Sequence, residues 1–312
     1  MNKKQYYGMV LLISSILAPF ILLVTSTKAA DNGQSFTISP PIFELKANPG
    51  DRLEETVSVY NSNSYDLPLV TTVENLKPMG EKGQVQVIGG SDEGLPTLKE
   101  WIKINTVNFT VTKGGTKNVT FSINVPSNAE PGGHFATVLF GTTSSSLEGS
   151  GSQVSQKIGT LVLLTVAGTT QEAAEVTQFA PEKTLFWRNQ AINFNLKIYN
   201  SGNVYVRPRG YMVITNIFGN KVAQIEIDDK NILPTAVRDI PQEYKPKFLF
   251  GPYTASLALV YGNSNQNINA TCGFWVIPWL QTSIGLIVLI LLFLLRRRLW
   301  KAIKIIFGKD KK

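Results

Sequence analysis

An uncharged run close to the end of the chain is the feature that most constrains its fold. Residues 274–295 contain no Asp, Glu, Lys or Arg, and about 20 apolar residues are enough for a helix to cross a bilayer. Arg296, Arg297 and Arg298 follow directly, and positively charged flanks remain on the cytoplasmic side. We therefore predict a transmembrane helix at 274–295.

The start of the chain has the three-part pattern of a secretory signal. Two lysines precede an apolar run at 8–24, and small residues up to Ala30 suit cleavage. We predict a signal peptide at 1–30. Residues 31–273 would then lie outside the cytoplasm, held to the cell membrane by a single span with a cytoplasmic C-terminus.

This topology gives roles to the residues that flank the predicted span. Trp275 and Trp279 would anchor it at the membrane interface. A basic cytoplasmic tail at 296–312, beginning with the three arginines, would orient the span and contact membrane lipid.

The charge of the chain is concentrated at its ends. The whole sequence carries a net charge of +8, but residues 31–273 hold 19 basic and 21 acidic residues, a net charge of −2. The exported part therefore lacks the basic bias of a nucleic-acid-binding protein, and we expect no nucleic acid partner.

The chain has a single cysteine, Cys272, so an intramolecular disulfide is impossible. Stability must come from hydrophobic burial rather than from the cross-links on which many small secreted domains depend. Cys272 is interpreted as a small residue near the membrane interface, and a disulfide between two chains is the alternative.

Short strand patterns separated by Gly- and Pro-rich turns fill the region between the two ends. They comprise 36–45, 55–60, 67–73, 109–112, 119–125, 135–140 and 158–166, and then 176–179, 192–199, 204–215, 221–227, 247–250 and 253–261. Such spacing is typical of antiparallel sandwiches. We predict an all-β fold of two tandem immunoglobulin-like β-sandwiches plus one C-terminal transmembrane helix, with domains at 31–168 and 169–273. A long insertion near 75–106 is expected to form a flap on the first domain.

Two similar passages suggest that the domains are copies of one sandwich. Tyr60-Asn61-Ser62 and Tyr199-Asn200-Ser201 each end an alternating strand, and each domain later has a Pro/Gly turn, an aromatic residue, an apolar strand and a closing glycine. From the tyrosine to that glycine there are 81 residues in the first copy and 63 in the second. The insertion in the first domain can absorb the difference.

The first domain, roughly 36–168, resembles the peptidoglycan-binding domain of the WxL-interacting proteins of bacterial cell surfaces. The matching pieces are Ser39-Pro40-Pro41-Ile42-Phe43-Glu44-Leu45, Asn48-Pro49-Gly50, Tyr60-Asn61, Trp101-Ile102, Val125-Pro126, Pro131-Gly132 and Ile158-Gly159. The second domain is similar to the family's host-binding domain in position and sandwich pattern. The resemblance implies binding to the cell wall and to other surface proteins.

The residues that carry catalytic chemistry are scarce. The chain has one histidine, His134, so a catalytic triad would depend on it and a histidine-rich metal site is impossible. No cysteine pair, phosphate-binding glycine loop or calcium loop is present in the sequence. We expect no catalytic residues, no metal and no cofactor. A pair of carboxylates that meet only in space stays open as a route to glycoside hydrolysis.

Aromatic side chains are the remaining candidates for ligand contact. Trp101 in the insertion and Trp187 could stack on sugar rings or contact a protein, and the alternative is that each belongs to a core. Glycosylation sequons occur at Asn108, Asn118 and Asn269, and their use is left open.

Together these patterns predict a non-catalytic, membrane-anchored surface protein that binds cell-wall polymer or other surface proteins. The alternative is a membrane-anchored assembly factor or accessory subunit that docks an exported protein partner. A surface carbohydrate-active enzyme is the third hypothesis.

Overall fold

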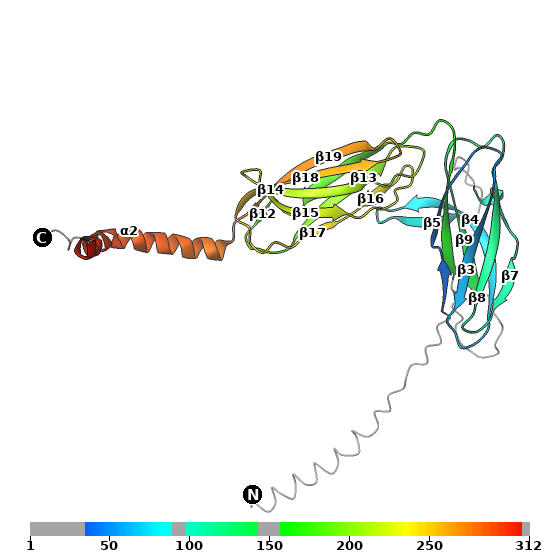
Figure 1. Ribbon diagram of the computed structural model, residues 1–312, viewed down its shortest axis with the longest axis horizontal. Coiled ribbons are helices and arrows are strands. Elements are labelled where there is room, and N and C mark those ends of the chain that lie inside the picture. Colours follow the sequence, from blue (N-terminus) through cyan, green and yellow to red (C-terminus); the bar gives the residue numbers. More distant parts are fainter. Residues whose placement is uncertain (1–34, 89–97, 143–156, 308–312) are drawn as a thin grey trace, which may run out of the picture. The chain divides into compact units, whose positions relative to one another are not determined.

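The computed structural model describes residues 35–88, 98–142 and 157–307 (Figure 1). Within these residues it consists of two β-sandwiches followed by one helix, α2 (Trp279–Phe307). The predicted all-β fold, with two immunoglobulin-like sandwiches and a C-terminal helix, is confirmed. The predicted signal peptide at 1–30 lies outside the described residues.

The first sandwich is built from two sheets. One sheet has the order β1 (Phe36–Ser39), β3 (Arg52–Asn61), β8 (Thr116–Asn124) and β6 (Ile102–Ile104). The other has the order β2 (Ile42–Ala47), β10 (Lys157–Val166), β9 (Gly132–Thr142), β4 (Leu67–Met79) and β5 (Gln84–Ile88), and β7 (Asn108–Val111) also pairs with β4. Neighbouring strands are antiparallel, except that β2 runs parallel to β10.

The second sandwich repeats this arrangement. Its first sheet contains β11 (Ala174–Pro181), β13 (Ile192–Asn200), β16 (Val237–Asp239) and β17 (Gln242–Tyr244), with β16 and β17 both pairing with β13. Its second sheet has the order β12 (Leu185–Phe186), β19 (Gln266–Val276), β18 (Gly251–Tyr261), β14 (Arg209–Asn216) and β15 (Lys221–Ile227). Here β12 runs parallel to β19, as β2 does to β10.

Alternation along the strands builds each core. Because successive side chains point to opposite faces of a sheet, every second apolar residue is buried between the two layers. The buried residues include Val57, Val59, Val138 and Phe140 in the first core, and Leu196, Ile198, Leu257 and Leu259 in the second.

The repeated asparagine that ends a strand has the same role in both sandwiches. The Asn61 amide nitrogen donates to the carbonyls of Tyr65 at 2.8 Å and Val111 at 3.0 Å, and its oxygen accepts from the Asn63 backbone N–H. The Asn200 amide nitrogen donates to the carbonyls of Val204 and Ile232, both at 2.8 Å, and its oxygen accepts from the Gly202 backbone N–H. Each buried amide therefore satisfies backbone groups on two segments of its sandwich.

The segment predicted to be a flap is largely regular where the structure describes it. Strand β4 continues to Met79 and turns into β5. After residues 89–97, which lie outside the described part, a short 3₁₀ helix (Lys99–Trp101) leads into β6, which joins the first sheet beside β8. The Asn75 side-chain oxygen accepts from the Lys99 backbone N–H at 3.0 Å, which ties the end of this segment to β4.

The predicted start of the span at 274 was wrong. Residues 274–276 belong to β19, where Phe274 is buried in the second core, and α2 begins at Trp279. An apolar strand that ends beside an apolar helix gives one uncharged run, so composition could not separate them. The helix also continues through Arg296, Arg297 and Arg298 to Phe307. Its part from Trp279 to Arg298 is long and apolar enough to cross a membrane.

Candidate functional site

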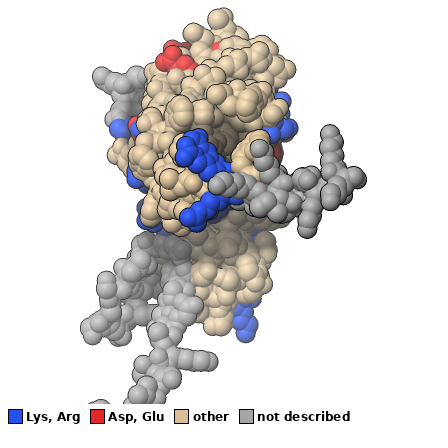
Figure 2. Space-filling view, turned by 90° about the vertical axis from the view of Figure 1, so that its left-hand side faces the viewer, with Lys and Arg blue, Asp and Glu red and all other residues tan. Residues whose placement is uncertain are grey.

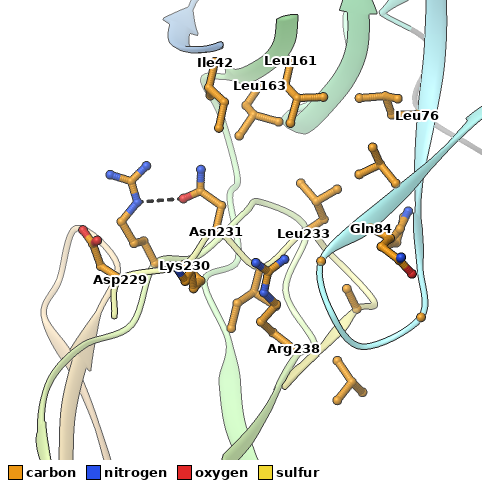
Figure 3. Close-up of a pocket in the computed structure, with 18 residues that line it drawn as sticks. Ile42, Leu76, Gln84, Leu161, Leu163, Asp229, Lys230, Asn231, Leu233 and Arg238 are labelled. Carbon is orange, nitrogen blue, oxygen red and sulfur yellow. Dashed lines mark hydrogen bonds between the residues drawn. The ribbon is translucent and has the colours of Figure 1, made fainter. Parts of the chain in front are cut away.

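A cleft lies between the two sandwiches. It has a volume of about 280 Å³ and is shown in Figure 3. One wall is the outer face of the β2–β10–β9–β4–β5 sheet, which contributes Ile42, Leu161, Leu163, Leu76 and Val85. The opposite wall comes from loops and strand ends of the second sandwich, including Leu233, the segment 229–232 and Arg238.

The apolar wall exists because β10 is hydrophobic on both of its faces. Val162 and Leu164 point into the first core, while Leu161 and Leu163 point outward to the cleft. An uninterrupted apolar run is typical of a strand that is covered on both sides. The outward residues join a small cluster formed by Leu76, Phe135, Leu163, Val85, Leu161, Tyr205 and Leu233, to which both sandwiches contribute.

Polar contacts close one edge of the cleft. The Arg207 Nε donates to the Asn231 side-chain oxygen at 2.8 Å (Figure 3). The Asn231 amide nitrogen donates to Glu44 Oε1 at 2.9 Å, and the Arg207 guanidinium forms an ion pair with the same carboxylate. Glu44 lies on β2, so this network connects the first sandwich with two loops of the second.

The β4–β5 hairpin closes another edge. The Asp239 backbone N–H donates to the Glu81 carbonyl at 2.6 Å, and Lys197 pairs with the Glu81 carboxylate at 2.5 Å. Arg238 passes directly over Gly83: a Cβ at that position would lie 0.8 Å from Arg238 Nη1. Burial lowers the pKa of Arg238 from its ordinary value. Only glycine leaves room for the guanidinium at this point.

The composition of the cleft favours binding over catalysis. Its lining has one carboxylate, Asp229, beside the cations Lys230, Arg207 and Arg238, so the two carboxylates that glycoside hydrolysis usually requires do not meet here. Across the described residues, no group of three His, Cys, Asp or Glu side chains is placed to hold a metal ion. Arg207 and Lys230 are paired with Glu44 and Asp228, so the rim is polar rather than strongly cationic. An apolar floor with a polar rim suits an apolar segment that carries polar flanks.

The two tryptophans proposed as ligand contacts are not part of this cleft. Trp101 is half-buried against the first core, and its ring lies 4.4 Å from that of His134 between centroids. Trp187 is well exposed and follows β12, at the end of the second sandwich from which α2 leaves. The structure therefore does not bring these two residues together.

The residues expected at the membrane also occupy different elements. Trp275 is exposed on β19, whereas Trp279 is the first residue of α2. Arg296, Arg297 and Arg298 are exposed on the last part of α2, and the Arg296 guanidinium lies 4.2 Å from the Phe293 ring centroid.

The sequons and the cysteine lie on strands rather than in loops. Asn108, Asn118 and Asn269 are exposed on β7, β8 and β19, respectively. Cys272 is half-buried on β19 against the second core, and burial raises the pKa of its thiol to about 11. The thiolate needed for disulfide exchange is therefore disfavoured at neutral pH.

Sequence reasoning missed the cleft residues, although one signal was present. The run Leu161-Val162-Leu163-Leu164 is apolar at consecutive positions, which predicts a partner on each side of the strand. Nothing local in the sequence identifies Arg207, Asn231 or Arg238, because they meet the first sandwich only through the fold.

Comparison with known proteins gives structural likeness alone. No family model matches the chain, and no curated protein matches it. Solved structures similar to it include a chaperone–tip adhesin complex of CFA/I fimbriae biogenesis (13% identity, TM-score 0.40, covering 77% of this chain and 98% of that one). The class 5 fimbriae chaperone CfaA (14%, 0.41, 77% and 99%) and the Escherichia coli chaperone DraB (13%, 0.38, 76% and 96%) are also similar. At these identities and TM-scores, the likeness transfers no function.

Proposed function

We propose that this chain is a non-catalytic, membrane-anchored docking protein whose partner is another exported protein. The observation that carries the proposal is the cleft between the sandwiches, with its wall of Ile42, Leu161 and Leu163 opposite the loops of the second sandwich. Apolar side chains of a protein segment would fill this wall, and polar or acidic flanks would meet Arg238, while Arg207 and Lys230 are paired with Glu44 and Asp228.

Of the functions that the sequence predicts, the docking of an exported partner fits this site better than the binding of cell-wall polymer. Sugar polymers are commonly recognised by exposed aromatic rings on which they stack. Trp101 is instead packed against His134 and the first core, and Trp187 is exposed but lies outside the cleft. Cell-wall binding, as implied by the resemblance to WxL-interacting proteins, stays a prediction and forms one arm of the test.

The proposed location follows from the ends of the chain. A signal peptide at 1–30 and a span within α2 would place both sandwiches outside the cytoplasm and the basic end of α2 inside. Protease added to wall-stripped intact cells should degrade the sandwiches and spare a tag placed after residue 312. Loss of that tag on intact cells would contradict this orientation.

The binding proposal is tested by changing one wall of the cleft in the full-length chain. Leu161→Asp places a charge in the apolar wall, and Val87→Asp makes the same kind of change at an exposed position of β5 outside the cleft. Exported proteins captured by cross-linking to the tagged chain would be purified and their affinity for each purified variant measured. Binding should fall strongly for Leu161→Asp and persist for Val87→Asp, and a melting curve of each purified variant shows whether its sandwiches remain folded at the temperature of the assay.

Purified cell-wall fragments form the second arm. Two results together would replace the proposed function with polymer binding. The wild-type chain and Leu161→Asp would sediment equally with these fragments, and Leu161→Asp and Val87→Asp would bind the protein partner equally.

A further inference from the structure

Exposed apolar side chains gather at one end of the second sandwich. Phe218 is 83% and Ile217 is 70% exposed, and four further aromatic residues are each more than half exposed: Trp187, Phe248, Phe250 and Trp275. We call these six residues the apolar end patch. The other exposed large apolar side chains of the described second sandwich are Tyr211 at 45% and Val222 at 39%, and both are less exposed than the patch. Such a concentration on a soluble face marks an interaction surface.

Strand pairing shows that all of these residues lie at the end where α2 begins. Strand β19 ends at Val276, which pairs with Gly251 at the start of β18, so Phe248 and Phe250 precede β18 at that end. Asn216, the last residue of β14, pairs with Tyr253, so the turn with Ile217 and Phe218 lies there too.

Trp187 and Trp275 belong to the same end. Phe186 pairs with Val276, so Trp187 leaves β12 beside the end of β19, and Trp275 is the residue before Val276.

The connection between this end and the helix is short and fixed. Two residues separate Val276 from Trp279. The backbone N–H of Ile277 donates to the Phe186 carbonyl at 2.8 Å, and that of Trp279 donates to the Trp187 carbonyl at 3.1 Å. If α2 enters a membrane at Trp279, the end of the sandwich must lie at the surface of that membrane.

The chemistry of the patch matches a lipid surface. The loops at 216–220 and 245–251 contain two lysines and no carboxylate, and Arg188 follows Trp187. Lys245 is paired with Glu243 at 2.9 Å. In the view from the side of α2, Lys and Arg side chains lie near the centre and Asp and Glu appear only in small patches away from it (Figure 2). Aromatic residues beside basic residues are typical of the membrane–water interface.

A shallow hollow extends the patch along the helix. It has a volume of about 370 Å³ and lies between Phe248, Phe250 and the first turns of α2, as far as Leu286 and Leu289. Its lining is almost entirely apolar, and part of a lipid acyl chain has the chemistry to fill it.

We propose that the apolar end patch lies in the headgroup layer of the bilayer that α2 enters, so that the second sandwich contacts the extracytoplasmic surface of that bilayer. The inference depends on α2 crossing a membrane and not on what the cleft binds. Arg209 pairs with Val260 at the opposite end of the same sheet, next to the loops that reach the cleft. Strand β18 has 11 residues, and at roughly 3.3 Å per residue it would place the cleft end of the sandwich about 35 Å from the patch.

The test places a polarity-sensitive fluorophore on the patch of the full-length chain. Cys272→Ala removes the single native cysteine, and Phe218→Cys or Phe250→Cys supplies a labelling site. Tyr60→Cys, at an exposed position of the first sandwich, is the matched control. The labelled chain is incorporated at one copy per nanodisc, in phosphatidylcholine with phosphatidylglycerol, so that a second copy cannot cover the patch.

The expected result is a blue-shifted emission for the labels at 218 and 250, quenching by lipids that carry a spin label near the headgroup, and loss of most of the quenching by aqueous iodide. The label at 60 should show none of these changes. Equal iodide quenching at all three sites would overturn the proposal. Shielding at 218 that develops only when a second copy or an exported protein is added would also overturn it, because the patch would then be a protein interface.

Discussion

The two sandwiches share a strand order and a strand-end asparagine, yet they differ in length in one place. In the first sandwich the carbonyl of Val111 lies 50 residues after Asn61, and in the second the carbonyl of Ile232 lies 32 residues after Asn200. That difference of 18 residues equals the whole difference between the intervals of 81 and 63 residues that run from the tyrosine to the closing glycine. All 18 extra residues of the first sandwich therefore lie between Asn61 and Val111, whose carbonyl accepts from the Asn61 amide.

This location explains which elements the second sandwich lacks. The pairing of β7 with β4 at Val111 and Leu67 corresponds to the isolated bridge between Ile232 and Val206. Within the described residues, the 3₁₀ helix at Lys99–Trp101 and β6 have no counterpart in the second sandwich. The comparison shows that this fold accepts an insertion on the connection after β5, provided that the asparagine still reaches both of its carbonyls.

The largest expected effect tests whether the two cores are equivalent. Phe121 and Phe194 are both fully buried, one in each core. Phe121→Ala and Phe194→Ala should each lower the free energy of unfolding by about 3–5 kcal/mol, because each leaves a cavity. Hydrogen exchange of the full-length chain would show the loss in the sandwich that carries the substitution. A loss spread equally over both sandwiches would mean that they unfold as one unit.

The next effect tests the repeated asparagine. Asn61→Ala and Asn200→Ala each remove at least two side-chain hydrogen bonds to backbone carbonyls and one hydrogen bond accepted from a backbone N–H. We expect each to cost about 2–4 kcal/mol of stability, measured by denaturant unfolding. Asn269→Ala, at an exposed position of β19, is the control and should change stability by less than about 0.5 kcal/mol. A small effect at one site and a large one at the other would contradict the equivalence of the two asparagines.

The alternation of apolar and polar residues and the turn residues were enough to predict the sandwiches, because the apolar positions of each strand indicate which of its faces is buried. The same reasoning failed at the start of α2, where Phe274 and Val276 are apolar strand residues that continue directly into an apolar helix. The cleft could be predicted only in part. The run at 161–164 indicates a covered outer face, but Arg238 and Gly83 are brought together by tertiary structure that no spacing reveals.

A smaller effect tests the contact between the sandwiches. Gly83 and Gly80 both lie in the β4–β5 turn with positive φ, 73° and 64°, so an alanine at either position is strained by about 1 kcal/mol. Gly83→Ala would also displace Arg238, whereas the nearest atom to a Cβ at Gly80 is 3.6 Å away. Gly83→Ala should therefore increase hydrogen exchange at the Asp239 amide more than Gly80→Ala does. Equal exchange in the two variants would show that Arg238 moves away without loosening the contact.

The smallest expected effect is a pH dependence confined to the first sandwich, which holds the single histidine of the chain. His134 is buried, and its Nε2 lies 2.9 Å from the Glu130 carbonyl, so that nitrogen carries the proton. Its Nδ1 is buried with no partner among the described residues, and the Trp101 ring lies 4.4 Å from the His134 ring between centroids. Burial lowers the pKa of His134 below 6.5, although Glu130 opposes the shift.

Above the unfolded pKa of about 6.5 both states are neutral and the histidine has no effect on stability. As the pH falls below that value, the unfolded chain binds a proton that the folded chain resists, so stability decreases until the folded pKa is passed. Unfolding followed by hydrogen exchange should show the first sandwich losing more stability than the second between pH 7.5 and 5.5. His134→Gln, which can still donate to the Glu130 carbonyl but does not titrate, should remove that excess. An unchanged excess in His134→Gln would assign the pH dependence to carboxylates instead.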